Sequence, residues 1–133
     1  MAANARLPRV DERVWVVRGT ERRPYPWGAP FGEGNANTRE EVLGRPCAVG
    51  LYVRDCTPDG VSDLAGNVGE WTADSREVSP EEAVGAPNDD GKHIEFFIHP
   101  GSWNEPSMAA WAKALSMAPP SARWTGLGFR LVR

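Results

Sequence analysis

Two carboxylates, one asparagine and two glycines lie within the nine residues from Asp63 to Trp71. Asp and Glu side chains, together with backbone carbonyls, supply the oxygen ligands that a hard cation such as Ca²⁺ prefers. Glycine permits the sharp turns that direct carbonyls inward. We therefore interpret the segment as a candidate ion-binding loop that Trp71 anchors to the core. In the alternative interpretation, Asp63 and Asn67 cap turns and Glu70 makes a salt bridge.

The other residues that could do chemistry form no standard catalytic or metal-binding pattern. Cys47 and Cys56 match no zinc-site spacing with the two histidines, so we expect either buried free thiols or one disulfide. His93 and His99 flank a predicted strand, and we expect them on the surface or in loops rather than on one metal. Ser102 lies in Gly-Ser-Trp, which is not a nucleophile-elbow sequence. Nothing here predicts a hydrolase triad.

Length and charge restrict the class of protein. The 133 residues, with 41% hydrophobic content, predict one soluble domain spanning residues 1–133. The net charge of −3 does not indicate nucleic-acid binding, and we interpret Arg18, Arg22 and Arg23 as a solvated turn. No apolar run approaches the ~18 residues of a membrane span, and Met1–Asn4 lacks a signal-peptide core. We expect a cytoplasmic domain, or surface display or secretion if it belongs to a longer precursor.

Glycine and proline interrupt the chain throughout, so the elements that position these residues must be short. The sequence contains 14 Gly, 12 Pro and six Trp, which predicts a loop-rich domain with tryptophan anchors. Helical segments are expected at residues 9–18, 38–43 and 106–115, and strands at 49–53, 72–73, 94–98 and 128–132. Residues 74–92 are expected to form a surface loop, with the acidic run 88–91 in a solvated turn.

Five separated motifs resemble one protein family in order. They are Arg6-Leu7-Pro8 with Arg18-Gly19, Tyr25-Pro26-Trp27-Gly28, the segment Asp63–Trp71, Gly101-Ser102-Trp103-Asn104, and Gly128-Phe129-Arg130-Leu131. Together they resemble the formylglycine-generating-enzyme, or sulfatase-modifying-factor, family. The resemblance implies an α+β fold of the C-type-lectin-like class, loop-rich with short helices and small antiparallel sheets, lacking the family's usual N-terminal portion.

The resemblance also bears on catalysis. Active family enzymes oxidise a substrate cysteine with a copper-binding cysteine pair in their C-terminal segment, and another branch uses iron held largely by a helical partner domain. Residues 107–133 contain no cysteine, and Cu(I) requires soft thiolate ligands. We therefore expect no copper, no iron and no enzymatic activity. The alternative is a fragment or degenerate member of one of these enzymes.

Of the two ion sites of the family, we expect this chain to keep one and to lose the other. By resemblance, one structural Ca²⁺ would be bound by the side chains of Asp63 and Glu70 and by the carbonyls of Gly66 and Val68. A second ion would use Asn37 with a later Asp, but residues 38–48 contain no Asp. We expect that second site to be lost.

In this fold the C-terminal segment would form an exposed ligand-binding face. Trp and Met side chains among small residues provide adaptable contacts. Trp103 is expected in the core, whereas Trp111, Met117 and Trp124 are expected on the surface. The predicted ligand-binding residues are Asn104, Met108, Trp111, Lys113, Leu115, Met117, Arg123 and Trp124, and the expected partner is a protein or another macromolecule.

Two kinds of recognition module remain open. The chain resembles variable proteins of diversity-generating retroelements, in which a hypervariable segment lies between motifs like Gly101–Trp103 and Gly128–Arg130. The other kind is a sensor or adaptor domain of a larger signalling or defence protein.

Overall fold

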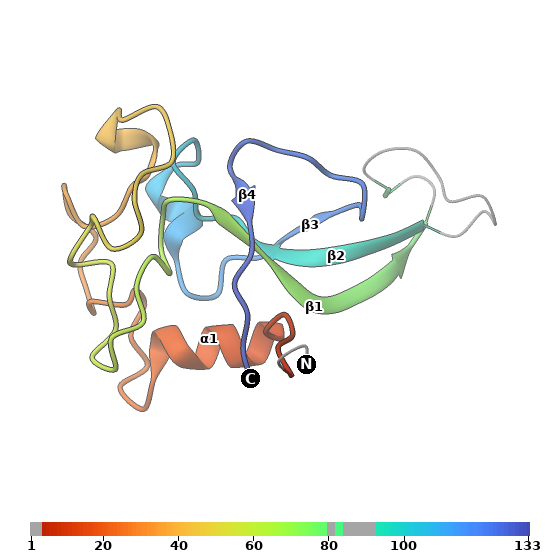
Figure 1. The fold of residues 1–133 in the computed structure, drawn as a ribbon, viewed down its shortest axis with the longest axis horizontal. Coiled ribbons are helices and arrows are strands. Elements are labelled where there is room, and N and C mark those ends of the chain that lie inside the picture. Colours follow the sequence, from red (N-terminus) through yellow and green to blue (C-terminus); the bar gives the residue numbers. More distant parts are fainter. Residues whose placement is uncertain (1–3, 80–81, 84–92) are drawn as a thin grey trace.

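A computed structural model describes residues 4–79, 82–83 and 93–133. Its helices are the α-helix α1 (Val10–Arg18) and the short 3₁₀ helices η1 (Arg39–Glu41) and η2 (Ser107–Ala110). Its strands are β1 (Gly69–Val78), β2 (His93–His99), β3 (Ser116–Ala118) and β4 (Leu127–Gly128). The four strands form one mixed sheet in the order β3-β2-β1-β4, with β4 parallel to β1 and the other pairs antiparallel. Figure 1 shows α1 running along one side of this sheet, with η1, η2 and long loops gathered at one end. The α+β, loop-rich class predicted from the sequence is confirmed.

The helix expected at residues 9–18 is present as α1. Its first turn carries Asp11 and Glu12, which suit the positive end of the helix dipole, and the Glu12 carboxylate accepts a hydrogen bond from the Arg9 N–H at 2.8 Å. Gly19 ends the helix with φ +54°. The residues that α1 buries, Arg13 and Val17, lie four positions apart and therefore on one face.

The first strand is much longer than expected. β1 runs from Gly69 to Val78, so residues 74–78, predicted as loop, belong to the strand, and residues 75–78 pair with β2. The register shifts between Trp71 and Ser75, and polar residues occupy the exposed positions after this irregularity. In the second half of the strand, the sequence therefore shows no regular alternation of apolar and polar residues. The predicted acidic turn 88–91 lies outside the described residues.

Three other predicted elements are wrong in extent or type. Residues 48–55 form turns rather than a strand, because Gly50 adopts φ +76° and its neighbours are exposed. The helix predicted for 106–115 ends at Ala110, because the Ala112 N–H bonds to the Pro24 carbonyl instead of continuing the helix. The strand predicted for 128–132 is split into β4 and an isolated bridge between Val132 and Arg6. β3 was not predicted.

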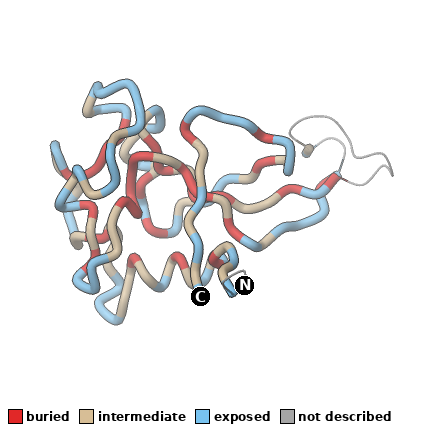
Figure 2. Tube along the Cα trace, in the orientation of Figure 1, coloured by how far each residue is buried: buried red, intermediate tan, exposed pale blue. Residues whose placement is uncertain are grey.

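Within the described residues, the hydrophobic core consists of three small clusters. They contain Val17, Leu64 and Ala112; Ala36, Ala65 and Ala110; and Ile98, Ala118 and Ala122. Trp71 packs on the third cluster, which confirms its anchoring role, and Trp27 packs on the second. Trp15, Trp111 and Trp124 are exposed, so only part of the tryptophan content stabilises the interior. Figure 2 shows buried stretches where the loops meet the sheet.

In the part of the chain that is described, no helix is long and apolar enough to cross a membrane.

Candidate functional site

Asp55 organises the loop that the sequence marks as an ion-binding candidate. Its carboxylate is buried and accepts hydrogen bonds from the N–H groups of Leu64, Ala65 and Gly66 at 2.9–3.1 Å. Three consecutive backbone donors converging on one carboxylate fix the path of this loop. Sequence reasoning missed Asp55, because this interaction joins two loops and has no local spacing rule.

Glu70 is the centre of a cluster of two arginines and one glutamate, in which Arg130 is half-buried and the other two residues are buried. Its Oε2 accepts from Arg13 Nε at 2.8 Å and its Oε1 from Arg130 Nε at 2.7 Å. The side chains of Arg13 and Glu70 are only 3% and 4% exposed. The same guanidinium groups donate to the carbonyls of Leu64 (from Arg13, 2.6 Å) and Asp63 (from Arg130, 2.8 Å). This arginine–glutamate cluster therefore joins α1, the loop, β1 and the C-terminal segment.

The residues proposed as calcium ligands do not fit an ion in this arrangement. Both oxygens of Glu70 already face cations, and Asp63 Oδ2 accepts from the Gly50 N–H at 2.8 Å. Among the described residues, no group of three or more His, Cys, Asp or Glu side chains could hold a metal ion. Contrary to the family resemblance, we therefore expect no Ca²⁺ ion at Asp63, Gly66, Val68 and Glu70, because the guanidinium groups supply the positive charge that the ion would bring.

A thermal melt with and without a chelator distinguishes a loop in which arginines neutralise Glu70 from a loop that binds Ca²⁺. We expect an unchanged Tm in excess EDTA and no increase with added Ca²⁺, because the Glu70 carboxylate is neutralised by arginines. A Tm that falls in EDTA and recovers with Ca²⁺ would restore the ion and imply that Arg13 or Arg130 moves away.

Asn37 has a structural role close to the same loop. Its side chain donates to the carbonyl of Arg45 at 3.0 Å and to Asn67 Oδ1 at 3.3 Å. Asn67 Oδ1 also accepts from the Cys47 N–H at 2.9 Å. Cys47 and Cys56 are both free thiols and half-buried, which decides between the two alternatives left open by the sequence.

Both histidines are buried, contrary to the expectation that they lie on the surface or in loops. They are the first and last residues of β2. His99 Nε2 donates to the Trp111 carbonyl at 3.1 Å, and its Nδ1 accepts from the Gly101 N–H at 3.3 Å. Burial lowers the pKa of His99 well below its usual value, so the ring is neutral. His99 thereby fixes the start of the C-terminal segment.

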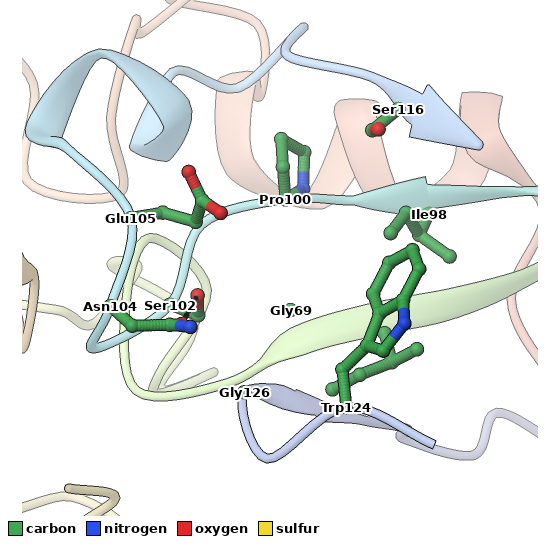
Figure 3. A pocket seen from close by; sticks show the side chains of 10 residues that line it. Gly69, Ile98, Pro100, Ser102, Asn104, Glu105, Ser116, Trp124 and Gly126 are labelled. Atoms are coloured by element: carbon green, nitrogen blue, oxygen red, sulfur yellow. Dashed lines mark hydrogen bonds between the residues drawn. The ribbon is translucent and has the colours of Figure 1, made fainter. Parts of the chain in front are cut away.

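The C-terminal segment and the sheet enclose a small pocket of about 160 Å³, here called the Trp124 pocket. Figure 3 shows Ser102, Asn104 and Glu105 on one side and Trp124 on the other, with Gly69 and Gly126 between them. Ser102 Oγ donates to Asn104 Oδ1 at 2.8 Å. The full lining is Gly69, Ile98, Pro100, Ser102, Asn104, Glu105, Ser116, Trp124, Gly126 and Leu127.

Glycine is required at position 126 by close packing. A Cβ atom there would collide with Asn104 Oδ1 and would lie 3.2 Å from Ser102 Oγ. The absent side chain therefore lets the polar groups approach the backbone next to Trp124. No sequence rule identified this contact, although Gly126 precedes the Gly128-Phe129-Arg130 motif.

The predicted ligand-binding residues do not all share one face. Asn104 and Trp124 line the Trp124 pocket, and Arg123 lies beside Trp124 in an adjoining groove. Lys113 and Leu115 instead line hollows against α1.

The remaining members of the predicted set lie on neither of these surfaces. Met108 and Trp111 are exposed around η2, and Met117 is half-buried in β3 opposite Phe97. Trp103, expected in the core, is only half-buried. The C-terminal segment contributes to separate surfaces because neighbouring residues of an extended chain point to opposite sides, as Leu115 and Ser116 do.

The fold and the arrangement of the C-terminal segment define a C-type-lectin-like domain of the formylglycine-generating-enzyme type. The family model described as "Sulfatase-modifying factor enzyme 1-like domain" matches residues 1–133. The chain belongs to this family. Among curated proteins, no sequence match was found.

Solved structures with the same fold support this assignment. PvdO from Pseudomonas aeruginosa is 25% identical with a TM-score of 0.72, over 96% of this chain and 51% of that one. Treponema denticola variable protein 1 is 22% identical with a TM-score of 0.71, over 96% and 46%. CarF is 20% identical with a TM-score of 0.69, over 97% and 47%. The present chain thus spans about half the length of these structures.

Proposed function

We propose that this domain is a non-catalytic recognition module whose ligand binds at the Trp124 pocket. The observation that carries the proposal is Trp124 itself, which is 46% exposed and faces Asn104 and Glu105 across a glycine floor. An aromatic face opposite fixed polar groups is a common arrangement in binding sites.

The size and charge of the pocket favour one side chain of a protein ligand. Its 160 Å³ is well below the ~300–1,000 Å³ of pockets for drug-sized molecules. In the described part of the chain, the Glu105 carboxylate forms no ion pair. A Lys or Arg side chain would gain a charge partner from Glu105 and a cation–π contact from Trp124.

The absence of thiols from the pocket supports a non-catalytic role. Neither Cys47 nor Cys56 lines the Trp124 pocket, and Cu(I) chemistry of the family type needs thiolates. Turnover of a cysteine-containing peptide with stoichiometric copper or iron would overturn the non-catalytic proposal and favour the enzyme alternative.

The fold shared with Treponema denticola variable protein 1 supports retroelement diversification of the C-terminal segment. The relevant observation is genomic. A near-copy of the terminal coding segment beside a reverse transcriptase gene, differing only at template adenines, would support diversification. A neighbourhood without either would favour the sensor or adaptor interpretation.

Selection from a displayed random-peptide library tests the pocket. We expect enriched peptides with a Lys or Arg anchor, and at least about tenfold weaker binding of these peptides to Trp124→Ala and Glu105→Gln variants. Arg45→Gln, an exposed change outside the pocket, serves as the control. Peptides that bind the Trp124→Ala variant as well as the unmodified domain would refute this assignment.

A further inference from the structure

We propose a second interaction surface, between α1 and residues 113–115, that docks an acidic segment of a partner protein through an apolar anchor residue. It is distinct from the Trp124 pocket, and it uses Lys113 and Leu115 from the opposite side of the C-terminal segment. The inference goes beyond the proposed function and does not depend on it.

The surface is a continuous groove made of two adjoining hollows. Both are lined by Asp11, Val14 and Lys113, so the hollows meet along α1. We call this the α1 groove. Its other lining residues are Arg9, Val10, Asp74 and Leu115 in one hollow, and Trp15, Arg18, Gly19 and Arg22 in the other.

An exposed aromatic side chain provides the apolar part of the groove. Trp15 is 62% exposed and makes no ring contact within the described residues. Leu115 is also exposed, and Val14 is half-buried between them on the groove wall. Tryptophan contributes large binding energies when a partner covers it, and it is enriched at the centres of interfaces.

The charges around Trp15 select the kind of partner. Within the described residues, the side chains of Arg18, Arg22 and Lys113 form no ion pair or hydrogen bond. The two acidic residues of the groove are already engaged. Asp11 pairs with Arg9 at 3.0 Å, and Asp74 Oδ2 accepts from the Val10 N–H at 2.6 Å.

The groove therefore presents three unpaired cations in a chain whose net charge is −3. Complementary charge steers association and excludes like-charged partners. An acidic peptide with one large apolar residue matches both the unpaired cations and the exposed tryptophan, since its carboxylates reach the cations while the apolar residue covers Trp15.

Fluorescence anisotropy with a labelled peptide of glutamates flanking one leucine tests the proposal. An otherwise identical glutamine peptide is the ligand control. We expect the glutamate peptide to bind more tightly, with an affinity that falls as salt increases. Trp15→Ala and Lys113→Glu should each weaken binding by at least about tenfold. Arg54→Glu makes the same charge change outside the groove and should leave Kd within about twofold.

Several outcomes would overturn the proposal. They are failure of the glutamate peptide to bind, equal binding of the glutamine peptide, and an equal loss of affinity in Arg54→Glu, which would indicate a net-charge effect. Loss of binding in Trp124→Ala would assign the peptide to the Trp124 pocket instead. Tighter binding of a DNA oligonucleotide at the same residues would replace the acidic protein by nucleic acid. Thermal melts of Trp15→Ala and Lys113→Glu should match that of the unmodified domain, because both side chains are exposed.

Discussion

Replacing Glu70 by Gln is expected to lower the free energy of unfolding by about 3–5 kcal/mol, a large fraction of the stability of a typical domain. The substitution keeps the shape of the side chain but removes the charge that neutralises Arg13 and Arg130. Arg13 is almost fully buried, and burial already lowers its pKa despite the opposing effect of Glu70. Without the carboxylate, a guanidinium group would remain desolvated and unpaired.

Urea denaturation monitored by circular dichroism measures this change. The matched control is Glu12→Gln, which removes the charge of an exposed ion pair between Arg6 and Glu12, and little change is expected because water screens that pair. Equal effects of the two substitutions would contradict the role assigned to the buried cluster.

A double-mutant cycle separates the pair from its individual residues. Arg13→Met removes the buried cation and fills similar space, so Arg13→Met combined with Glu70→Gln should be less destabilised than the sum of the single changes. Strictly additive effects would show that Arg13 and Glu70 are not energetically coupled, despite the 2.8 Å separation of Nε and Oε2.

The second large effect is expected at Asp55. Asp55→Asn should lower the free energy of unfolding by at least about 2 kcal/mol at neutral pH. One carboxylate oxygen becomes an NH₂ group, and this donor would face two backbone N–H groups, either those of Leu64 and Ala65 or those of Ala65 and Gly66. Chemical denaturation measures the loss. Asp59→Asn, an exposed acid nearby, is the control and should change stability little. A fully stable Asp55→Asn variant would mean that these hydrogen bonds do not hold the loop.

The pH dependence of the same pair of proteins provides an independent measurement. Burial raises the pKa of Asp55 to about 6, against the opposing effect of its backbone hydrogen bonds. A folded-state pKa above the unfolded value means that this group's contribution is full below about pH 4 and is lost as pH rises through about 6.

The stability difference between the unmodified domain and Asp55→Asn should therefore grow by up to about 3 kcal/mol between pH 7 and pH 4. Comparing the two proteins cancels the contributions of other titrating groups to the pH dependence of stability. One of these groups is His99, whose lowered pKa makes stability fall on acidification. A difference that shrinks on acidification would show that the three backbone N–H groups outweigh burial.

Local signals in the sequence were sufficient for several elements. The helix start near Pro8 and its end at Gly19 were predicted within one residue, because capping and glycine act over a single turn. The strand around residues 94–98 followed from its β-branched and aromatic content, and Trp71 was correctly placed against the core. The family motifs gave the fold class. The free state of Cys47 and Cys56, by contrast, was only one of two alternatives.

What the sequence by itself determined about this protein is its family, its fold class and the short segments whose turns are specified by nearby residues. Only the tertiary structure decided the partners of Glu70, the role of Asp55 and the division of the C-terminal segment between the Trp124 pocket and the α1 groove. The physical reason is distance along the chain. Arg13 and Arg130 reach Glu70 from 57 and 60 residues away, and such contacts depend on packing that no local pattern encodes.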